Sequence, residues 1–278
     1  MEFLKYIAMG VMQGITEFLP VSSSGHLALL KHLFGDSFLE IGMSYDILLH
    51  LATLIAVFCV YRKDIWNLIT AFFRMVKGIF TKEKSIWEDE YVRLILLLIV
   101  GCIPAGIAGF AFGDIIEAFF AKHLWSIGAM LLVTSVLMFL CDRLVEGNKS
   151  AKTATWKQAL LTGLFQACAI VPGLSRSGST VTGGLLAGLS REFAVKYSFL
   201  LSIPVILGAA ITDIPDLLGE AGASIAWGSA ICGMIVATAV GYLSIRFMLK
   251  LFSNKKLSVF GWYCLVVGLA TILISVIG

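Results

Sequence analysis

The sequence is short of charge. Only 14% of its 278 residues are Asp, Glu, Lys or Arg, whereas soluble domains carry about a quarter. Hydrophobic residues make up 59% of the chain, and the 21 Lys and Arg residues lie mainly in a few loops between apolar runs. This composition excludes a soluble globular domain, and we expect no nucleic-acid partner. It predicts a protein that crosses a membrane several times.

The sequence also lacks paired cysteines. Its six cysteines stand singly, mostly inside apolar runs, and no two of them are separated by only two residues. Neither a zinc site nor a disulfide framework is therefore indicated. We expect the thiols to pack as small hydrophobic side chains.

Six apolar runs are candidates to cross a bilayer, which takes about twenty residues. They lie at 45–61, 94–112, 124–141, 193–211, 225–243 and 259–277. Two further regions, 3–34 and 159–189, each hold two short apolar pieces separated by a break rich in Pro, Ser and Gly. Such a break is tolerated at membrane depth only where it is buried in protein or lines a cavity. Each region is therefore predicted to be a re-entrant helical hairpin.

The Lys and Arg residues follow the first, third and fifth spans and are nearly absent after the second and fourth. The positive-inside rule makes the three basic loops cytoplasmic, so the first hairpin enters from outside and both termini lie outside. Three spans separate the hairpins, so the second hairpin enters from the opposite face. We predict an all-α polytopic membrane protein, a single domain of residues 1–278. It has six transmembrane helices and two re-entrant hairpins in an inverted-topology repeat, with halves at about 1–142 and 159–278.

The first break carries polar side chains that are costly at membrane depth and therefore indicate a functional site. Glu17 is its only acid, and Gln13 lies one helical turn earlier on the same face. The two side chains could hold one hard cation such as Mg²⁺ and leave it open to substrate oxygens. Ser23 and His26 are three residues apart, so the imidazole could activate the hydroxyl. Alternatively, His26 protonates a leaving phosphate or attacks phosphorus itself. One of the three serines at 22–24 is expected only to cap the helix that follows.

The second break suits a phosphate group. Arg176 can place its guanidinium fork on phosphate oxygens and stays charged when desolvated. A Gly/Ser loop that opens a short helix also favours an anion. Alternatively, Arg176 has a structural role and forms an ion pair with Glu17 that holds the two halves together. Arg176 can have both roles if the ion pair forms in the absence of substrate and phosphate binds in its place. The neighbouring positions expected to bind substrate are Ser22, Ser24, Ser175, Ser177, Gly178 and Thr180.

One further polar residue, His50, lies inside the first span. A lone histidine in an apolar helix is more often a packing residue than a ligand. We therefore assign His50 to packing.

The two breaks resemble the signatures of the undecaprenyl-diphosphate phosphatase family, the integral-membrane enzymes also called bacitracin resistance proteins. The first signature, Glu/Gln-x-x-x-Glu followed by Leu-Pro-Val-Ser-Ser-x-Gly-His, stands at 13–26. The second, Pro-Gly-x-Ser-Arg-Ser-Gly-x-Thr, stands at 172–180. The resemblance implies removal of the terminal phosphate of a C55 polyprenyl diphosphate, which returns the lipid carrier to cell-wall synthesis. It implies that the catalytic residues are Glu17, Ser23, His26 and Arg176.

The resemblance also implies dependence on a divalent cation, Mg²⁺ or Ca²⁺, held by Gln13 and Glu17, and a site in the plasma membrane that opens to the outer face. Gln13 takes the amide alternative at the first signature position, which leaves Glu17 as the only carboxylate. Ser23, His26 and an activated water remain alternative nucleophiles. The oligomeric state, a homodimer included, stays open.

Two rival functions share part of this pattern. Inverted repeats with broken helices also occur in secondary transporters, so the alternative is a flippase that moves a polyprenyl phosphate across the bilayer. The lipid phosphatases with a histidine nucleophile need a second histidine six residues after Arg176, where this chain has Thr182. That class is therefore disfavoured.

Overall fold

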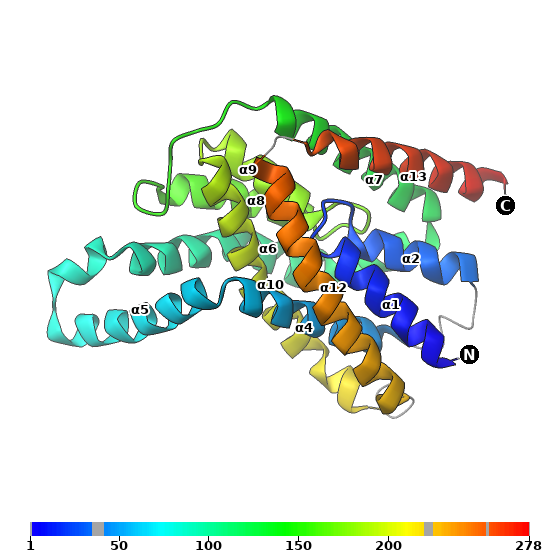
Figure 1. Cartoon of the computed structure of the whole chain (residues 1–278), viewed down its shortest axis with the longest axis horizontal. Coiled ribbons are helices and arrows are strands. Elements are labelled where there is room, and N and C mark those ends of the chain that lie inside the picture. The colour runs from blue at the N-terminus through cyan, green and yellow to red at the C-terminus, as the bar shows by residue number, and fades with distance from the viewer. Residues whose placement is uncertain (1, 35–41, 220–224, 254–255, 278) are drawn as a thin grey trace.

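The computed structural model describes all residues except 1, 35–41, 220–224, 254–255 and 278. The described chain folds into helices, with one isolated β-bridge between Lys149 and Leu189. This confirms the all-α polytopic membrane protein that the sequence predicts. Five described helices are long and apolar enough to cross a membrane (Figure 1): α6 (Glu90–Lys122), α7 (Leu124–Arg143), α10 (Arg191–Leu218), α12 (Trp227–Ser253) and α13 (Ser258–Ile277).

The first predicted span corresponds to α4 (Gly42–Val60). Its 19 residues measure about 28 Å, close to the roughly 30 Å of a bilayer's hydrocarbon core. The chain then bends by 90° into α5 (Arg62–Thr81). On α5, Trp66 and Phe73 are exposed. An exposed aromatic face on a helix that leaves the span direction is typical of a helix lying at the membrane surface.

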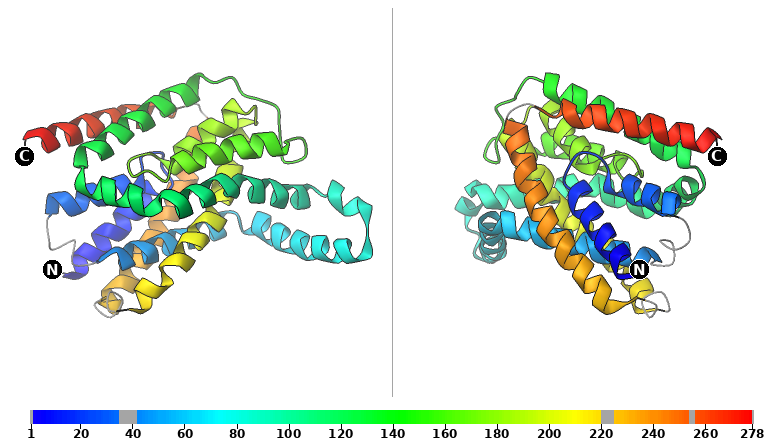
Figure 2. Two further views of the ribbon diagram at one scale, coloured as in Figure 1. Left: turned by 180° about the vertical axis from the view of Figure 1, so that it is seen from behind. Right: turned by 45° about the vertical axis from the view of Figure 1, so that its right-hand side comes forward.

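The helix α6 is longer than the span predicted at 94–112. Its 33 residues measure about 50 Å, well beyond the hydrocarbon core. Its first turns pack beside α5 and the short 3₁₀ helix η1 (Lys84–Glu88), and together they form an arm that projects from the body (Figures 1 and 2). The sequence pattern located only the apolar middle of this helix.

Among the described residues, four α-helices are too short to cross the bilayer: α1 (Glu2–Thr16), α2 (Ser23–Phe34), α8 (Trp156–Cys168) and α9 (Arg176–Leu186). The helix α1 packs against α2, and α8 packs against α9. Each pair therefore folds back on itself with the polar break at its tip, as a re-entrant hairpin requires. Almost the whole of α9 is buried.

The packing between the two halves supports the predicted inverted repeat. The helix α1 packs against α12, and its counterpart α8 packs against α6, while α7 pairs with α13 and α4 with α10. In an inverted repeat, every contact between two helices must recur between their counterparts in the other half, and these pairs meet that requirement. A side chain at Gly10 would collide with the carbonyl oxygen of Gly233, and one at Gly163 with that of Gly101. Glycines thus bring equivalent helices equally close, although the repeat itself stays a prediction.

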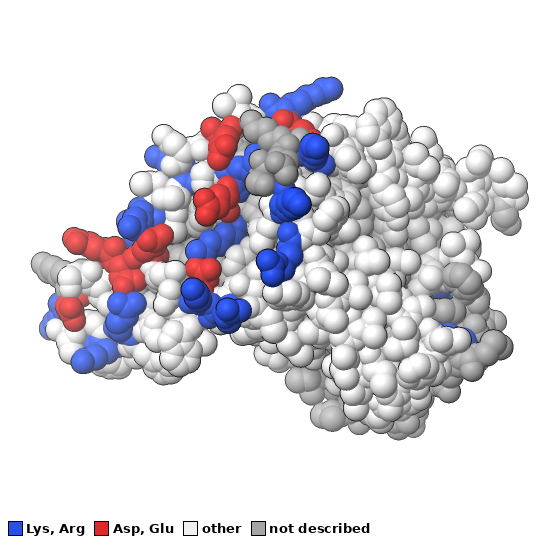
Figure 3. Space-filling model, viewed as in Figure 1, with Lys and Arg blue, Asp and Glu red and all other residues white. Residues whose placement is uncertain are grey.

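Charged side chains gather at one end of the molecule, over α5, the start of α6 and the last turns of α12 (Figure 3). The helix α1 begins and α13 ends on the opposite side (Figure 1). The loops that carry most of the Lys and Arg residues therefore share one side, as the predicted orientation requires.

Candidate active site

The first polar break begins as an extension of α1. The backbone N–H of Glu17 donates to the carbonyl of Gln13 at 2.9 Å, so both side chains project from one face. The Gln13 amide donates to Glu17 Oε2 at 3.0 Å. Pro20 stops the helix because its ring removes a backbone donor. Ser22 then adopts a left-handed φ of 69°, which is rare for a non-glycine residue, and α2 starts at Ser23.

The second break places Arg176 at the first position of α9. Ser175 caps that helix: its hydroxyl accepts the N–H of Gly178 at 3.2 Å. Two residues earlier, Gly173 has a φ of +91°, and a Cβ there would lie against the carbonyl oxygen of Ile127. The turn that presents Arg176 therefore requires glycine.

The hydroxyl of Ser22 joins the two breaks. It accepts the backbone N–H of Gly173 at 3.1 Å and that of Gly25 at 3.3 Å. A left-handed Ser22 turns its side chain between the two loops, and this contact accounts for its strained backbone. The expected convergence of both breaks on one place is thus realised.

Glu17 is the centre of the resulting site. Its side chain is 3% exposed, and its Oε1 accepts from the Arg176 guanidinium. Its Oε2 accepts from the hydroxyl of Ser23 at 2.7 Å, in addition to the Gln13 amide. A buried carboxylate is tolerated only when it is paired and hydrogen-bonded, and all of these partners meet that need. Arg176 is 18% exposed, so one side of the cluster remains accessible.

His50 of α4 also faces this carboxylate. Its Nε2 lies 3.5 Å from Glu17 Oε2, and its Nδ1 lies 2.8 Å from the carbonyl of Asp46. Both ring nitrogens of His50 thus face oxygen atoms that accept hydrogen bonds. In addition to the packing role that we expect for His50, its ring therefore faces the carboxylate at the centre of the site. The signal that could have found it was available, since a polar residue inside an apolar span indicates function by the same rule applied to the breaks.

His26 is held by different partners. Its Nδ1 lies 2.8 Å from the carbonyl of Ser22, and its Nε2 lies 2.8 Å from the hydroxyl of Tyr263 on α13. The carbonyl can only accept, so Nδ1 carries the hydrogen and Nε2 of the neutral ring accepts from Tyr263. The described contacts therefore link Ser23 to Glu17 rather than to His26, and Tyr263 is a partner that no sequence motif indicated.

The other predicted substrate-binding residues are mostly engaged in holding the loops. Ser175 N–H donates to Thr134 of α7 at 3.0 Å, and the hydroxyl of Thr180 lies 2.5 Å from that of Ser198. Ser177 and Gly178 are buried beside them, whereas Ser24 is exposed. Within this set the structure thus leaves Ser24 facing outward, and substrate binding by the others stays a prediction.

The donors for a divalent cation are few. No three His, Cys, Asp or Glu side chains form a metal-binding group within the described residues. The buried Oε1 of Gln13, however, has no hydrogen-bond partner there, and it belongs to the residue beside Glu17. One amide oxygen and one carboxylate suit Mg²⁺, which is often held by few protein ligands together with substrate phosphates. The residues present therefore fit an open cation site.

Comparison with known proteins identifies this arrangement. The family model described as bacitracin resistance protein BacA matches residues 6–270, which include both breaks. The chain belongs to the BacA family. An undecaprenyl-diphosphatase of Methanosphaera stadtmanae is 40% identical over 100% of this chain and 99% of its own length. Those of Halothermothrix orenii and Alkaliphilus metalliredigens are also 40% identical, over 99% and 100% of each chain respectively. The BacA match and these relatives span the hairpins, α4 and α13, and so cover every residue of the cluster around Glu17 and His26.

Proposed function

We propose that this chain is an integral-membrane hydrolase that cleaves undecaprenyl diphosphate to undecaprenyl phosphate and inorganic phosphate, and so recycles the lipid carrier for cell-wall synthesis. The observation that carries the proposal is the buried contact between Glu17 and Arg176, which links the two polar hairpins. A guanidinium at the tip of a membrane hairpin suits a phosphate group on a lipid. Membership of the BacA family and the names of the relatives agree with it.

The terminal phosphate binds Arg176 in the proposed reaction. Its oxygens compete with Glu17 for the guanidinium fork, so the ion pair loosens when substrate arrives. Glu17 Oε1 is then released from the guanidinium, while Oε2 still accepts the hydroxyl of Ser23. Arg176 meanwhile stabilises the charge on the transferring phosphoryl group. The pair is thus the resting state of the site.

Ser23 is the nucleophile that the geometry favours. Its hydroxyl already donates to Glu17 at 2.7 Å. Its Oγ forms a bond to the terminal phosphorus, its proton passes to Glu17, and the bond from phosphorus to the bridging oxygen breaks, so undecaprenyl phosphate leaves. Water then attacks the phosphoserine phosphorus, the bond from phosphorus to Ser23 Oγ breaks, Oγ takes back the proton from Glu17, and inorganic phosphate leaves. His26 is suited to take a proton from that water, because its Nε2 accepts a hydrogen bond and its Nδ1–H is fixed by Ser22.

A divalent cation, Mg²⁺ or Ca²⁺, is proposed at Gln13 and Glu17. When bound there, it would neutralise phosphate charge during transfer. We also propose a plasma-membrane location in which the charged end of the molecule faces the cytoplasm and the first hairpin opens outward. The clustering of charge at one end supports this orientation (Figure 3).

Phosphate release by the purified chain tests the function. We expect release of inorganic phosphate from undecaprenyl diphosphate in detergent, where no two membrane sides exist, and loss of release in Ser23→Ala. A C15 diphosphate should be cleaved less efficiently if the long tail contributes to binding. Movement of a polyprenyl phosphate across vesicles without any phosphate release would instead identify a flippase.

A second prediction concerns the cation. Replacing Gln13 by Glu should lower the Mg²⁺ concentration needed for half-maximal activity by several fold, because a second carboxylate adds a charged oxygen ligand. Titrating Mg²⁺ into chelator-treated wild type and Gln13→Glu measures this. Gln158→Glu is a matched control, because Gln158 lies on α8 and pairs with Thr155. An unchanged Mg²⁺ requirement in Gln13→Glu would remove this residue from the cation site.

A further inference from the structure

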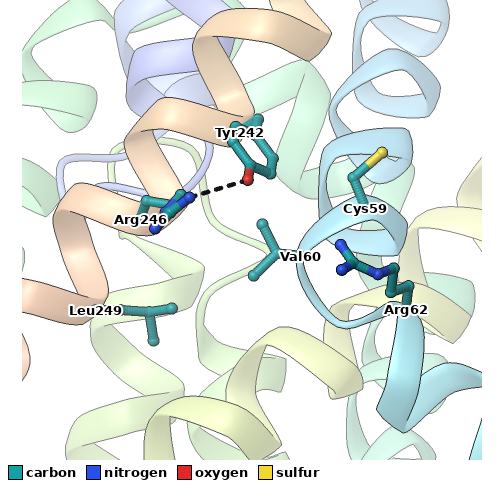
Figure 4. Close-up of a pocket in the computed structure, with 6 residues that line it drawn as sticks. All are labelled: Cys59, Val60, Arg62, Tyr242, Arg246 and Leu249. Atoms are coloured by element: carbon teal, nitrogen blue, oxygen red, sulfur yellow. Dashed lines mark hydrogen bonds between the residues drawn. The ribbon is translucent and has the colours of Figure 1, made fainter.

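A hollow whose lining does not include Glu17 lies between the corner that joins α4 to α5 and the last turns of α12 (Figure 4). Its volume is about 350 Å³. Figure 4 shows Arg62 on one side and Arg246 on the other, with Val60 between them. The complete lining is Cys59, Val60, Arg62, Tyr242, Arg246 and Leu249.

The two arginines make this hollow positive. Both are exposed, and neither forms an ion pair with an acid of the described chain. Arg246 is oriented by Tyr242: its Nη1 donates to the tyrosine hydroxyl at 3.2 Å, and its guanidinium carbon lies 5.8 Å from the ring centre. One guanidinium is thereby held in place at the edge of the hollow, with its remaining donors available.

The acid nearest in sequence does not cancel this charge. Asp64, in the first turn of α5, lies 2.5 Å from Lys196 and accepts from Tyr91 at 3.1 Å. It is therefore already paired with α10 and α6. The N-terminus of α5, whose cap residue Tyr61 makes no side-chain cap bond, adds the positive end of a helix dipole beside Arg62.

The surroundings define the ligand class. Val60 and Leu249 give the hollow an apolar wall beside the two arginines. Two separated guanidinium groups match the oxygens of a phosphate group. We propose that Arg62 and Arg246 form a binding site for an anionic phosphate group, carried by a membrane lipid headgroup or free in solution. This site is separate from the Glu17 cluster and does not depend on the proposed reaction.

The test measures binding to the purified full-length chain in detergent by native mass spectrometry and thermal melting. The probes are phosphatidylglycerol, phosphatidylcholine and inorganic phosphate. The variants are Arg62→Gln/Arg246→Gln, Tyr242→Phe and, as a matched control, Arg143→Gln, which alters an exposed arginine at the end of α7 outside the hollow. Melting without added ligand shows that each variant is folded.

We expect wild type and Arg143→Gln to bind phosphatidylglycerol at least about tenfold more tightly than Arg62→Gln/Arg246→Gln, since each charge-assisted hydrogen bond is worth about a factor of ten. Tyr242→Phe should weaken binding by several fold. Phosphatidylcholine, whose headgroup has no net charge, should bind weakly. If inorganic phosphate stabilises wild type but not the double variant, the free anion is sufficient for binding. If phosphatidylglycerol binds and inorganic phosphate does not stabilise wild type, the ligand is the lipid. Equal phosphatidylglycerol affinity in folded wild type and double variant would overturn the site.

Discussion

Replacing Arg176 by lysine should lower kcat/KM for phosphate release from undecaprenyl diphosphate by at least about a hundredfold, and Arg176→Ala should lower it further. The reason is geometric, because lysine keeps the charge but offers one compact ammonium where the site presents a planar fork. In the resting structure that fork already contacts Glu17, so its reach and direction are set by the carboxylate. Steady-state phosphate release by purified variants in detergent measures the effect.

Arg93→Lys is the matched control for this experiment. Arg93 is half-buried like Arg176, but it donates to the backbone carbonyl of Ala154 at 3.2 Å and lies outside the cluster. We expect its activity to stay within about threefold of wild type, since loss of one hydrogen bond to a carbonyl is a modest change. Near-normal turnover in Arg176→Lys or Arg176→Ala would remove the guanidinium from the mechanism.

Replacing Glu17 by Gln should reduce turnover about as strongly as Arg176→Lys. The amide has the shape of the carboxylate and can still contact Ser23 and Gln13, but it cannot accept the serine proton. General-base catalysis contributes roughly 10²–10⁴ in rate, so a loss within that range is expected. Burst kinetics of undecaprenyl phosphate formation, which report the first step, separate this loss from an effect on later hydrolysis.

The same variant tests the ion pair. Glu17→Gln leaves the partly buried Arg176 without its anion and should lower the melting temperature, whereas the double variant Glu17→Gln/Arg176→Gln should recover part of that loss. The coupling free energy between the two positions is expected to reach up to about 3 kcal/mol. The exposed pair of Lys152 and Glu90 is the control, with little coupling. Additive effects at Glu17 and Arg176 would contradict a direct interaction.

Local sequence was sufficient to find the two breaks. Pro20 and Gly173 stop regular helix for reasons that are visible in the residue types themselves, and Glu17 and Arg176 are conspicuous because charge is costly in an apolar setting. Counting the spans between the two hairpins predicted that they enter the membrane from opposite faces. The structure brings the side chains of Glu17 and Arg176 together. The length of α6 was underestimated, because its ends are not apolar and hydrophobicity detects only the part that resembles a membrane core.

The partners of these residues were not visible in the sequence. His50 and Tyr263 reach Glu17 and His26 from α4 and α13. His50 stands out as a polar residue in an apolar span, but neither segment indicates which side chain it contacts. The contact between Thr180 and Ser198 likewise depends on how α9 packs against α10.

By itself, the sequence determined that this protein is a helical membrane protein with two polar, helix-breaking hairpins, because residue type alone sets the cost of burying charge and the points where a helix must end. Only the tertiary structure decided that Ser23 donates to Glu17, that His26 donates to Ser22 and accepts from Tyr263, and that His50 joins the carboxylate cluster. The contacts of His26 with Tyr263 and of Glu17 with His50 join helices that are distant in the chain, and the local contacts depend on the turn between α1 and α2. Their geometry depends on packing distances and angles, which are set by close approaches such as Gly10 against Gly233 and are not encoded in periodicity.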